Sequence, residues 1–141
     1  KMLRVNFNEG KFSAVELWKS NRMKAKFTNL IFHKDHVFGL DDGMFACIDI
    51  ERGRRKWKEG RYGHGQILLR GNHILVMAEN GDVILLEADA EQHVELTRFA
   101  ALDGKTWNPP ALAGEYLLVR NHREAACYKL PLAKPAKVAA Q

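Results

Sequence analysis

The chain is poor in the residue patterns on which catalysis, metal binding and membrane insertion usually depend. It has two cysteines and four prolines in 141 residues, and no apolar run approaches the roughly 20 residues of a membrane-spanning helix. A Gly-rich phosphate loop, a nucleophile elbow and a cysteine pair with zinc-ligand spacing are all missing. The first residues also lack the apolar core of a signal peptide. These absences predict no catalytic residue, no metal site and no membrane span.

The net charge of +5 arises largely from one basic segment. Its basic residues are Arg52, Arg54, Arg55, Lys56, Lys58 and Arg61. On the outer strand of a sheet, such side chains are usually solvated and keep the exposed edge from pairing with other chains. Aromatic residues suited to base stacking are not interleaved with them, apart from Trp57 and Tyr62. We therefore expect no nucleic-acid partner.

The sequence repeats at intervals of about 40 residues, which is the period of a propeller blade built from short strands. The segment His36-Val37-Phe38 aligns with His73-Ile74-Leu75 and with Tyr116-Leu117-Leu118, at offsets of 37 and 43 residues. Trp18 aligns with Trp57 at an offset of 39 residues. The repeat predicts an all-β fold made of β-propeller blades, each with four antiparallel strands.

Apolar runs separated by turn residues divide the chain into units. They predict two strands of a blade remnant in 1–26, four strands in 27–60, four in 64–100, and a three-stranded last blade in 107–131. Pro131 cannot donate to a strand ladder, and the segment 132–141 has the composition of a disordered tail. Residues 1–131 thus correspond to about three blades. We expect them to be the C-terminal part of a ring of about seven or eight blades.

The spacing of cysteine and histidine argues against disulfide bonding and metal binding. Cys47 and Cys127 lie 80 residues apart, or two periods, so we expect both to be free, buried residues at equivalent places in two blades. His33 and His36 are three residues apart, which on a continuous strand would place them on opposite faces. Neither pair predicts a site.

The segment from Cys47 to Trp57 resembles the tryptophan-docking repeat of quinoprotein alcohol dehydrogenase-like (PQQ-like) propellers, Ala-x-Asp-x-x-Thr-Gly-Lys-x-x-Trp. Asp49, Gly53 and Trp57 match this pattern in register. The resemblance extends over about residues 12 to 130 to the bacterial PQQ-like repeat proteins, which include the propeller lipoprotein of outer-membrane barrel assembly. It implies structural docking roles for Asp49, Gly53, Trp57 and Trp18, and a periplasmic or extracellular location.

Ligands of propellers usually bind at the ring axis, close to the start of each innermost strand. The repeat alignment places five polar or aromatic candidates there: Asn29, His64, Gln66, Trp107 and Asn108. These side chains could face a shared channel, or they could hydrogen-bond the backbone of nearby turns. Among them, Trp107 is out of phase with the tryptophans of the fourth strands, which favours a role in ligand binding.

Two functions are consistent with the sequence. The first is a non-catalytic scaffold or a ligand- or protein-binding module without a cofactor, whose partners are further blades of the parent protein or another copy of the chain. The alternative is the C-terminal part of a dehydrogenase of the polyvinyl alcohol type. In such an enzyme, the resemblance implies pyrroloquinoline quinone with Ca²⁺. Asn29 and Asn108 are the axial residues with suitable ligand chemistry, and no carboxylate accompanies them in the alignment.

Overall fold

The computed structural model describes residues 1–131, which form thirteen β-strands and no helix. The strands are β1 (Met2–Asn8), β2 (Lys11–Trp18), β3 (Ile31–His33), β4 (His36–Asp41), β5 (Met44–Asp49), β6 (Arg55–Arg61), β7 (Gln66–Arg70), β8 (His73–Met77), β9 (Asp82–Glu87), β10 (Glu95–Ala100), β11 (Ala111–Ala113), β12 (Tyr116–Arg120) and β13 (Ala125–Lys129). The tail predicted for 132–141 lies outside the described residues.

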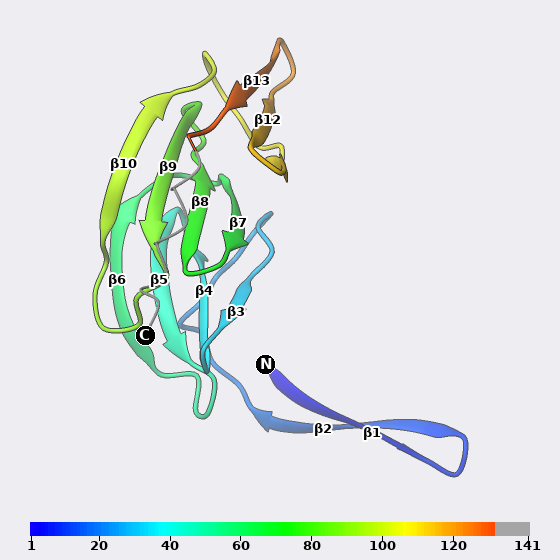
Figure 1. The fold of residues 1–141 in the computed structure, drawn as a ribbon. Helices are drawn as coiled ribbons and strands as arrows, with labels where there is room; N and C mark the ends of the chain where they lie inside the picture. The colour runs from blue at the N-terminus through cyan, green and yellow to red at the C-terminus, as the bar shows by residue number, and fades with distance from the viewer. Residues whose placement is uncertain (132–141) are drawn as a thin grey trace, which may run out of the picture.

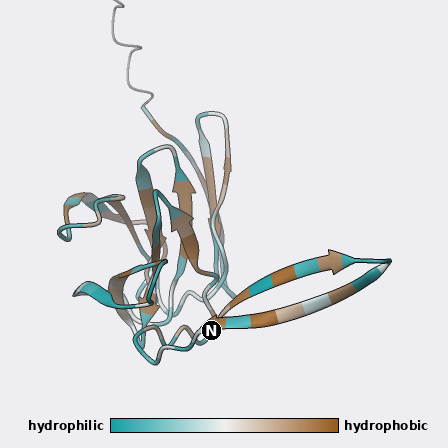
Figure 2. Ribbon diagram, turned by 90° about the horizontal axis from the view of Figure 1, so that it is seen from below, coloured by the Kyte–Doolittle hydropathy of each residue, from teal (hydrophilic) through white to brown (hydrophobic). Residues whose placement is uncertain are grey.

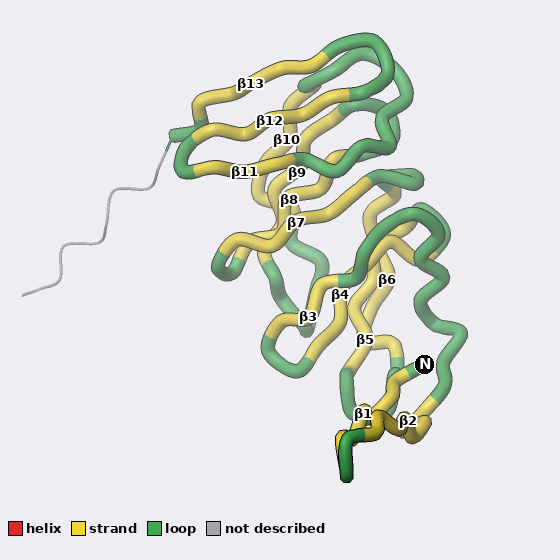
Figure 3. Tube along the Cα trace, turned by 90° about the vertical axis from the view of Figure 1, so that its right-hand side faces the viewer, coloured by secondary structure: helices red, strands yellow, loops and turns green. Residues whose placement is uncertain are grey.

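The strands form four antiparallel sheets, β1–β2, β3–β6, β7–β10 and β11–β13, each built from consecutive strands (Figure 1). The predicted all-β class and the grouping of two, four, four and three strands are confirmed. In Figure 3, the first strands β3, β7 and β11 lie on the side that faces the viewer. Neighbouring sheets are joined along that side, where Arg70 on β7 donates a hydrogen bond to the carbonyl oxygen of Gly114, 2.6 Å away.

Turn residues explain why the sheets are built from tight hairpins. In the β4–β5 hairpin, both turn residues have a positive φ, 53° at Asp42 and 84° at Gly43. Aspartate tolerates this conformation and glycine favours it, and turns of this kind match the right-handed twist of paired strands. The Asn80-Gly81 turn occupies the same place between β8 and β9, with a φ of 98° at Gly81. Local sequence therefore determines where each chain reversal occurs.

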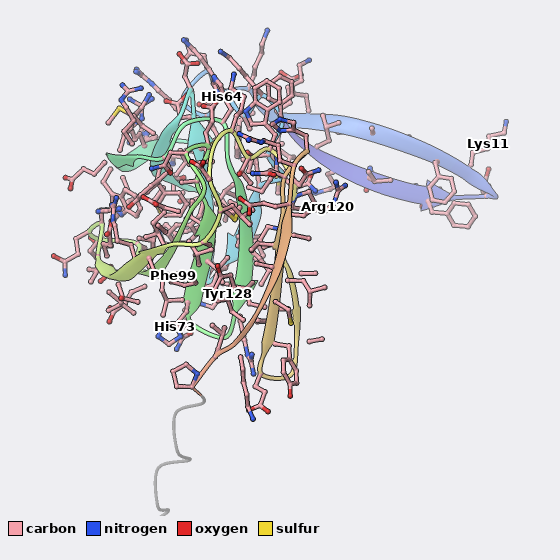
Figure 4. The ribbon with its side chains drawn as sticks, turned by 90° about the horizontal axis from the view of Figure 1, so that it is seen from above. Lys11, His64, His73, Phe99, Arg120 and Tyr128 are labelled. Carbon is pink, nitrogen blue, oxygen red and sulfur yellow. The ribbon has the colours of Figure 1, made fainter. Side chains whose placement is uncertain are left out.

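Two apolar cores lie between the sheets. The first joins β3–β6 to β7–β10 and contains Phe38, Phe45, Trp57, Ile74 and Leu86, among others. The second joins β7–β10 to β11–β13 through residues such as Leu75, Met77, Leu117 and Val119. Phe99 on β10 and Tyr128 on β13 point toward each other beside this second core, with ring centroids 5.0 Å apart (Figure 4). The three larger sheets are stabilised chiefly by burying a face against a neighbour.

A β-bulge recurs at the same place in three sheets. Leu17 on β2, Lys56 on β6 and Leu96 on β10 have no cross-strand partner, and they lie 39 and 40 residues apart. In a regular strand, residues three apart lie on opposite faces. The extra residue of the bulge in β6, Lys56, removes this alternation locally, so Arg55 and Lys58 lie on the same face. This repetition identifies β2, β6 and β10 as equivalent last strands of their sheets.

The β1–β2 hairpin, which we call the arm, projects away from the other three sheets (Figure 1). Lys11, at its turn, lies far from the rest of the molecule (Figure 4). Several large apolar side chains on the arm are exposed, including Val5 at 64% and Phe12 at 77%. The arm contacts the body near Trp18, as described below.

Two predictions about cysteine and histidine are wrong. Cys47 is buried, but Cys127 is exposed because the outer face of β11–β13 has no neighbouring sheet in the described chain. His33 and His36 are cross-strand neighbours on the same face, because the turn at Lys34-Asp35 reverses the chain between them. His36 Nδ1 lies 2.7 Å from the Lys34 carbonyl oxygen, so one ring nitrogen is engaged by its own turn.

Candidate functional site

The candidate residues lie in the loops that precede β3, β7 and β11. These loops gather at one end of the sheets, where Figure 4 shows His64, while His73 lies at the opposite end. Tyr62 N donates to the Gly43 carbonyl oxygen at 2.8 Å, and Thr106 N donates to the Glu79 carbonyl oxygen at 2.9 Å. The loops before β7 and β11 are therefore hydrogen-bonded to the turn between the second and third strands of the sheet before them.

A polar side chain at the end of each second strand holds the loop that leads into its own sheet. Asp41 Oδ1 accepts the backbone N–H of Lys24 at 2.8 Å, and Glu79 Oε2 accepts the backbone N–H of His64 at 2.9 Å. Asn121, just after β12, donates from Nδ2 to the Asp103 carbonyl oxygen at 2.9 Å. The three residues thus fix the entry of the chain into three successive sheets.

Glu79 is the centre of the candidate site. Its second carboxylate oxygen, Oε1, accepts the indole N–H of Trp107 at 2.9 Å, so that one carboxylate joins the loops before β7 and β11. The hydrogen bond from the His64 N–H, followed by that from Trp107, holds the pKa of Glu79 below its ordinary value. Glu79 is therefore ionised near neutral pH and acts as an acceptor in this structure.

Aromatic rings from all three loops form a cluster beside Glu79. The Phe27 ring lies 5.8 Å from the Trp107 ring and 6.1 Å, edge-on, from the His64 ring, measured between centroids. Lys105 Nζ lies 4.7 Å from the centre of the Trp107 ring, a distance suited to a cation–π contact. Phe27 and Trp107 are 64% and 46% exposed. The structure thus brings His64 and Trp107 together in a solvent-accessible aromatic cluster.

The three other candidates differ in how they are placed. Gln66 is buried and donates from Nε2 to the Phe27 carbonyl oxygen at 3.1 Å, which fastens the loop before β3 to β7. Asn29 is exposed and Asn108 is half-buried, and neither side chain takes part in the contacts with Glu79. Gln66 and Trp107 thus hydrogen-bond neighbouring groups of the protein itself.

Part of the basic segment is structural, contrary to the expectation that its side chains are solvated. Arg55 Nη2 and Lys58 Nζ lie 2.9 and 2.6 Å from Asp41 Oδ2, and the Asp41 side chain is 3% exposed. Burial by itself would raise the pKa of Asp41, but hydrogen bonds from Lys58 and from the Lys24 N–H outweigh it and the pKa is lowered. The bulge in β6 explains why both cations reach one carboxylate.

The docking residues of the first sheet meet the turn between β5 and β6. Trp18 Nε1 donates to the Ile50 carbonyl oxygen at 2.9 Å. A Cβ atom on Gly53 would lie 2.6 Å from a ring carbon of Trp18, so the indole lies directly on the glycine backbone. Asp49 accepts the N–H groups of Arg52 and Arg54 at 2.6 and 2.9 Å, which shapes the turn under the ring.

Trp57 lies in the core between β3–β6 and β7–β10, but its surroundings differ from those of Trp18. The residue is 8% exposed, its ring lies 5.8 Å from the His93 ring between centroids, and its Nε1 is buried without a hydrogen-bond partner. The imidazole belongs to a polar cluster in which the Tyr62 hydroxyl contacts His93 Nε2 at 2.8 Å and donates to Glu95 at 3.0 Å. The segment after β9 lacks the glycine turn on which Trp18 docks.

The residues at the candidate site do not fit a quinone–calcium centre. Calcium takes six to eight oxygen ligands, whereas this cluster offers one carboxylate that already accepts two hydrogen bonds. Throughout residues 1–131, no three His, Cys, Asp or Glu side chains are grouped closely enough to hold a metal ion. In the same range, no helix could span a membrane.

Sequence reasoning missed Asp41 and Glu79, the two carboxylates that organise these loops. Their positions could have identified them, since each directly precedes an Asx-Gly turn. Asp41 precedes Asp42-Gly43, and Glu79 precedes Asn80-Gly81. It also missed the cluster of Tyr62, His93 and Glu95. No spacing rule links Tyr62 to the other two, because it follows β6, whereas His93 lies just before β10 and Glu95 begins β10.

Comparison with known proteins does not identify a family. No family model matches the chain, and no curated protein matches it. Two computationally designed proteins are similar in structure. Ika4 is 12% identical, with a TM-score of 0.48, and the match covers 83% of this chain and 99% of that protein. Ika8 is 11% identical, with a TM-score of 0.39, covering 82% of this chain and 54% of that one. Neither likeness is close enough to carry an argument about function.

Proposed function

We propose that this chain is a non-catalytic segment of a PQQ-like β-propeller that acts as a scaffold or a binding module for proteins or ligands. Its four sheets are the blades or partial blades of that propeller, and its partners are further blades or another copy of the chain. In keeping with the resemblance of its docking segment, the protein acts on the periplasmic or extracellular side.

The main support for this proposal is that the polar groups at the candidate site already hydrogen-bond other parts of the protein. Glu79, the one carboxylate among the aromatic rings, accepts hydrogen bonds from His64 and Trp107 of two other loops. Gln66 donates to a backbone carbonyl, and Asp41 is neutralised by two cations. A catalytic carboxylate or amide has to reach a substrate, whereas these groups hold loops in place.

The exposed aromatic pair supports binding as the activity of the site. Phe27 and Trp107 offer apolar ring surface to solvent, beside the ionised Glu79 and the ammonium group of Lys105. Rings next to hydrogen-bonding groups are typical of binding sites, since the rings supply contact area and the polar groups supply orientation.

The test is to offer the chain the cofactor of the alternative function. After incubation with pyrroloquinoline quinone and Ca²⁺ followed by gel filtration, we expect no quinone absorbance in the protein peak and no dye-linked alcohol oxidation. Stoichiometric retention of the quinone would contradict the proposal and would favour the dehydrogenase. Trp107→Ala is the matched variant, since any quinone stacked on this ring should be lost with it.

A further inference from the structure

Two apolar sheet faces of the described chain have no neighbouring sheet. One is the outer face of β11–β13, and the other is the apolar face of the arm. We infer that these two faces bind each other between copies of the chain, so that the arm of one copy docks on β11–β13 of the next. The inference rests on the proposed function, because a protein that works by stacking sheets needs a sheet against each apolar face.

The outer face of β11–β13 is equivalent to a face that is fully buried elsewhere in the molecule. In the β3–β6 sheet, the cross-strand neighbours Phe38 and Cys47 pack on β7–β10 and are 1% and 0% exposed. The neighbours at the same place in β11–β13 are Leu118 and Cys127, of which Leu118 is 51% exposed. The last sheet therefore continues the stacking interface of the molecule but lacks the sheet that would cover it.

The arm has a single apolar face because its strands alternate. Cross-strand pairing puts Val5 opposite Ala14 and Phe7 opposite Phe12, and the two phenyl rings lie 4.7 Å apart. Leu3, Val5, Phe7 and Phe12 are 48, 64, 59 and 77% exposed. Figure 2 shows the alternation as hydrophobic and hydrophilic bands along the arm. An exposed apolar patch of this kind marks an interaction surface.

The apolar face points away from the contacts that the arm makes within its own chain. Trp18 pairs with Met2, which places both on the face that also carries Arg4, Asn6 and Ser13. It is this face that meets the β5–β6 turn, through the Trp18 hydrogen bond to Ile50. The apolar face is therefore free to meet another molecule while Trp18 stays docked.

The two faces differ in side-chain size in a way that suits packing. The arm presents large side chains, while small ones, Ala111 and Cys127, flank Leu118 in the central row of the outer face of the last sheet. Tyr116 and Lys129 lie beside Ala113 at one end of this face, and Arg120 lies beside Ala125 at the other end. Large side chains facing small ones allow two sheets to approach closely. The face of the arm comes from only two strands, and small interfaces are typical of weak, transient association, so we expect micromolar affinity. Because the faces are different, the contact is head to tail.

The test is sedimentation velocity on charged variants at concentrations from about 1 to 200 μM, which spans the expected affinity. Val5→Asp disrupts the apolar face of the arm, and Leu118→Asp disrupts the outer face of the last sheet. Val15→Asp is the matched control, since Val15 is 52% exposed on the other face of the same hairpin. We expect the wild type and Val15→Asp to associate with increasing concentration and the other two variants to stay monomeric.

Mixing the two defective variants identifies the geometry. A mixture of Val5→Asp and Leu118→Asp retains one intact pair of faces and should form a 1:1 dimer. Dimerisation of Leu118→Asp alone would show that two arms bind each other, and dimerisation of Val5→Asp alone would show that two last sheets do. Either result would overturn the inference, as would a wild-type chain that remains monomeric.

The exposed thiol gives a second readout. Cys127 is exposed and Cys47 is buried, so a thiol reagent should modify one cysteine in the monomer and a second only after unfolding. We expect the modification rate of Cys127 to fall at least tenfold in the associated wild type but not in Val5→Asp. An unchanged rate in the associated wild type would overturn the inference. Quinone binding is measured separately, so a failure of the inference and a failure of the proposed function can be distinguished.

Discussion

Substituting Gly53 by alanine tests whether Trp18 fastens the arm to the β3–β6 sheet. Gly53 has a φ of +63°, and a Cβ atom there would lie 2.6 Å from the Trp18 ring. Gly71 has nearly the same backbone conformation, with a φ of +60°, but no atom lies within 4 Å of the position of its Cβ. The two glycines are therefore a matched pair that differ in the tryptophan contact.

The expected costs follow from this difference. Alanine in a left-handed conformation costs about 1 kcal/mol or slightly more at either position. At Gly53, the Trp18 ring must also move off the turn, which loses its hydrogen bond to Ile50, worth about 1 kcal/mol. The move also exposes the apolar area of a half-buried ring, worth about another 1 kcal/mol. We expect Gly53→Ala to lower the free energy of unfolding by about 3 kcal/mol and Gly71→Ala by about 1 kcal/mol.

Denaturant unfolding followed by tryptophan fluorescence measures both values. Limited trypsin digestion supplies an independent readout, since release of Trp18 should speed cleavage at Lys19 and Arg22 in Gly53→Ala but not in Gly71→Ala. Equal losses of stability, to within about 0.5 kcal/mol, would refute the reasoning, because the conformational term would then explain both variants.

Two further variants test the core and the buried carboxylate. Trp57→Ala should lower the free energy of unfolding by about 3–5 kcal/mol, as for other buried aromatic side chains, and a loss below about 1 kcal/mol would contradict its position in the core. Asp41 has a lowered pKa, so its contribution is complete above its ordinary pKa of 3.8 and is lost as the pH falls through the folded value. In urea titrations, Asp41→Asn should therefore be less stable than the wild type at pH 7, and the difference should shrink as the pH falls below the ordinary pKa of 3.8.

The sequence determined the secondary structure and the strand grouping of this protein. Turns such as Asp42-Gly43 adopt their conformation through local backbone preferences, and strands alternate or are wholly apolar according to how many of their faces are buried. These are short-range effects, so a repeat of about 40 residues was sufficient to predict them. The same repeat placed His64 and Trp107 at equivalent ends of successive sheets, which brought them into one cluster.

Contacts between residues far apart in the sequence, both between sheets and across one sheet, were decided only by the tertiary structure. Cys127 and Cys47 occupy equivalent positions, yet one is exposed and the other buried, because burial depends on whether a neighbouring sheet is present. Arg55 and Lys58 reach Asp41 because a bulge changes the faces of β6, and Glu79 joins loops from two other parts of the chain. Such contacts depend on the geometry of packed sheets, in which residues far apart in sequence become neighbours, and no local pattern encodes that geometry.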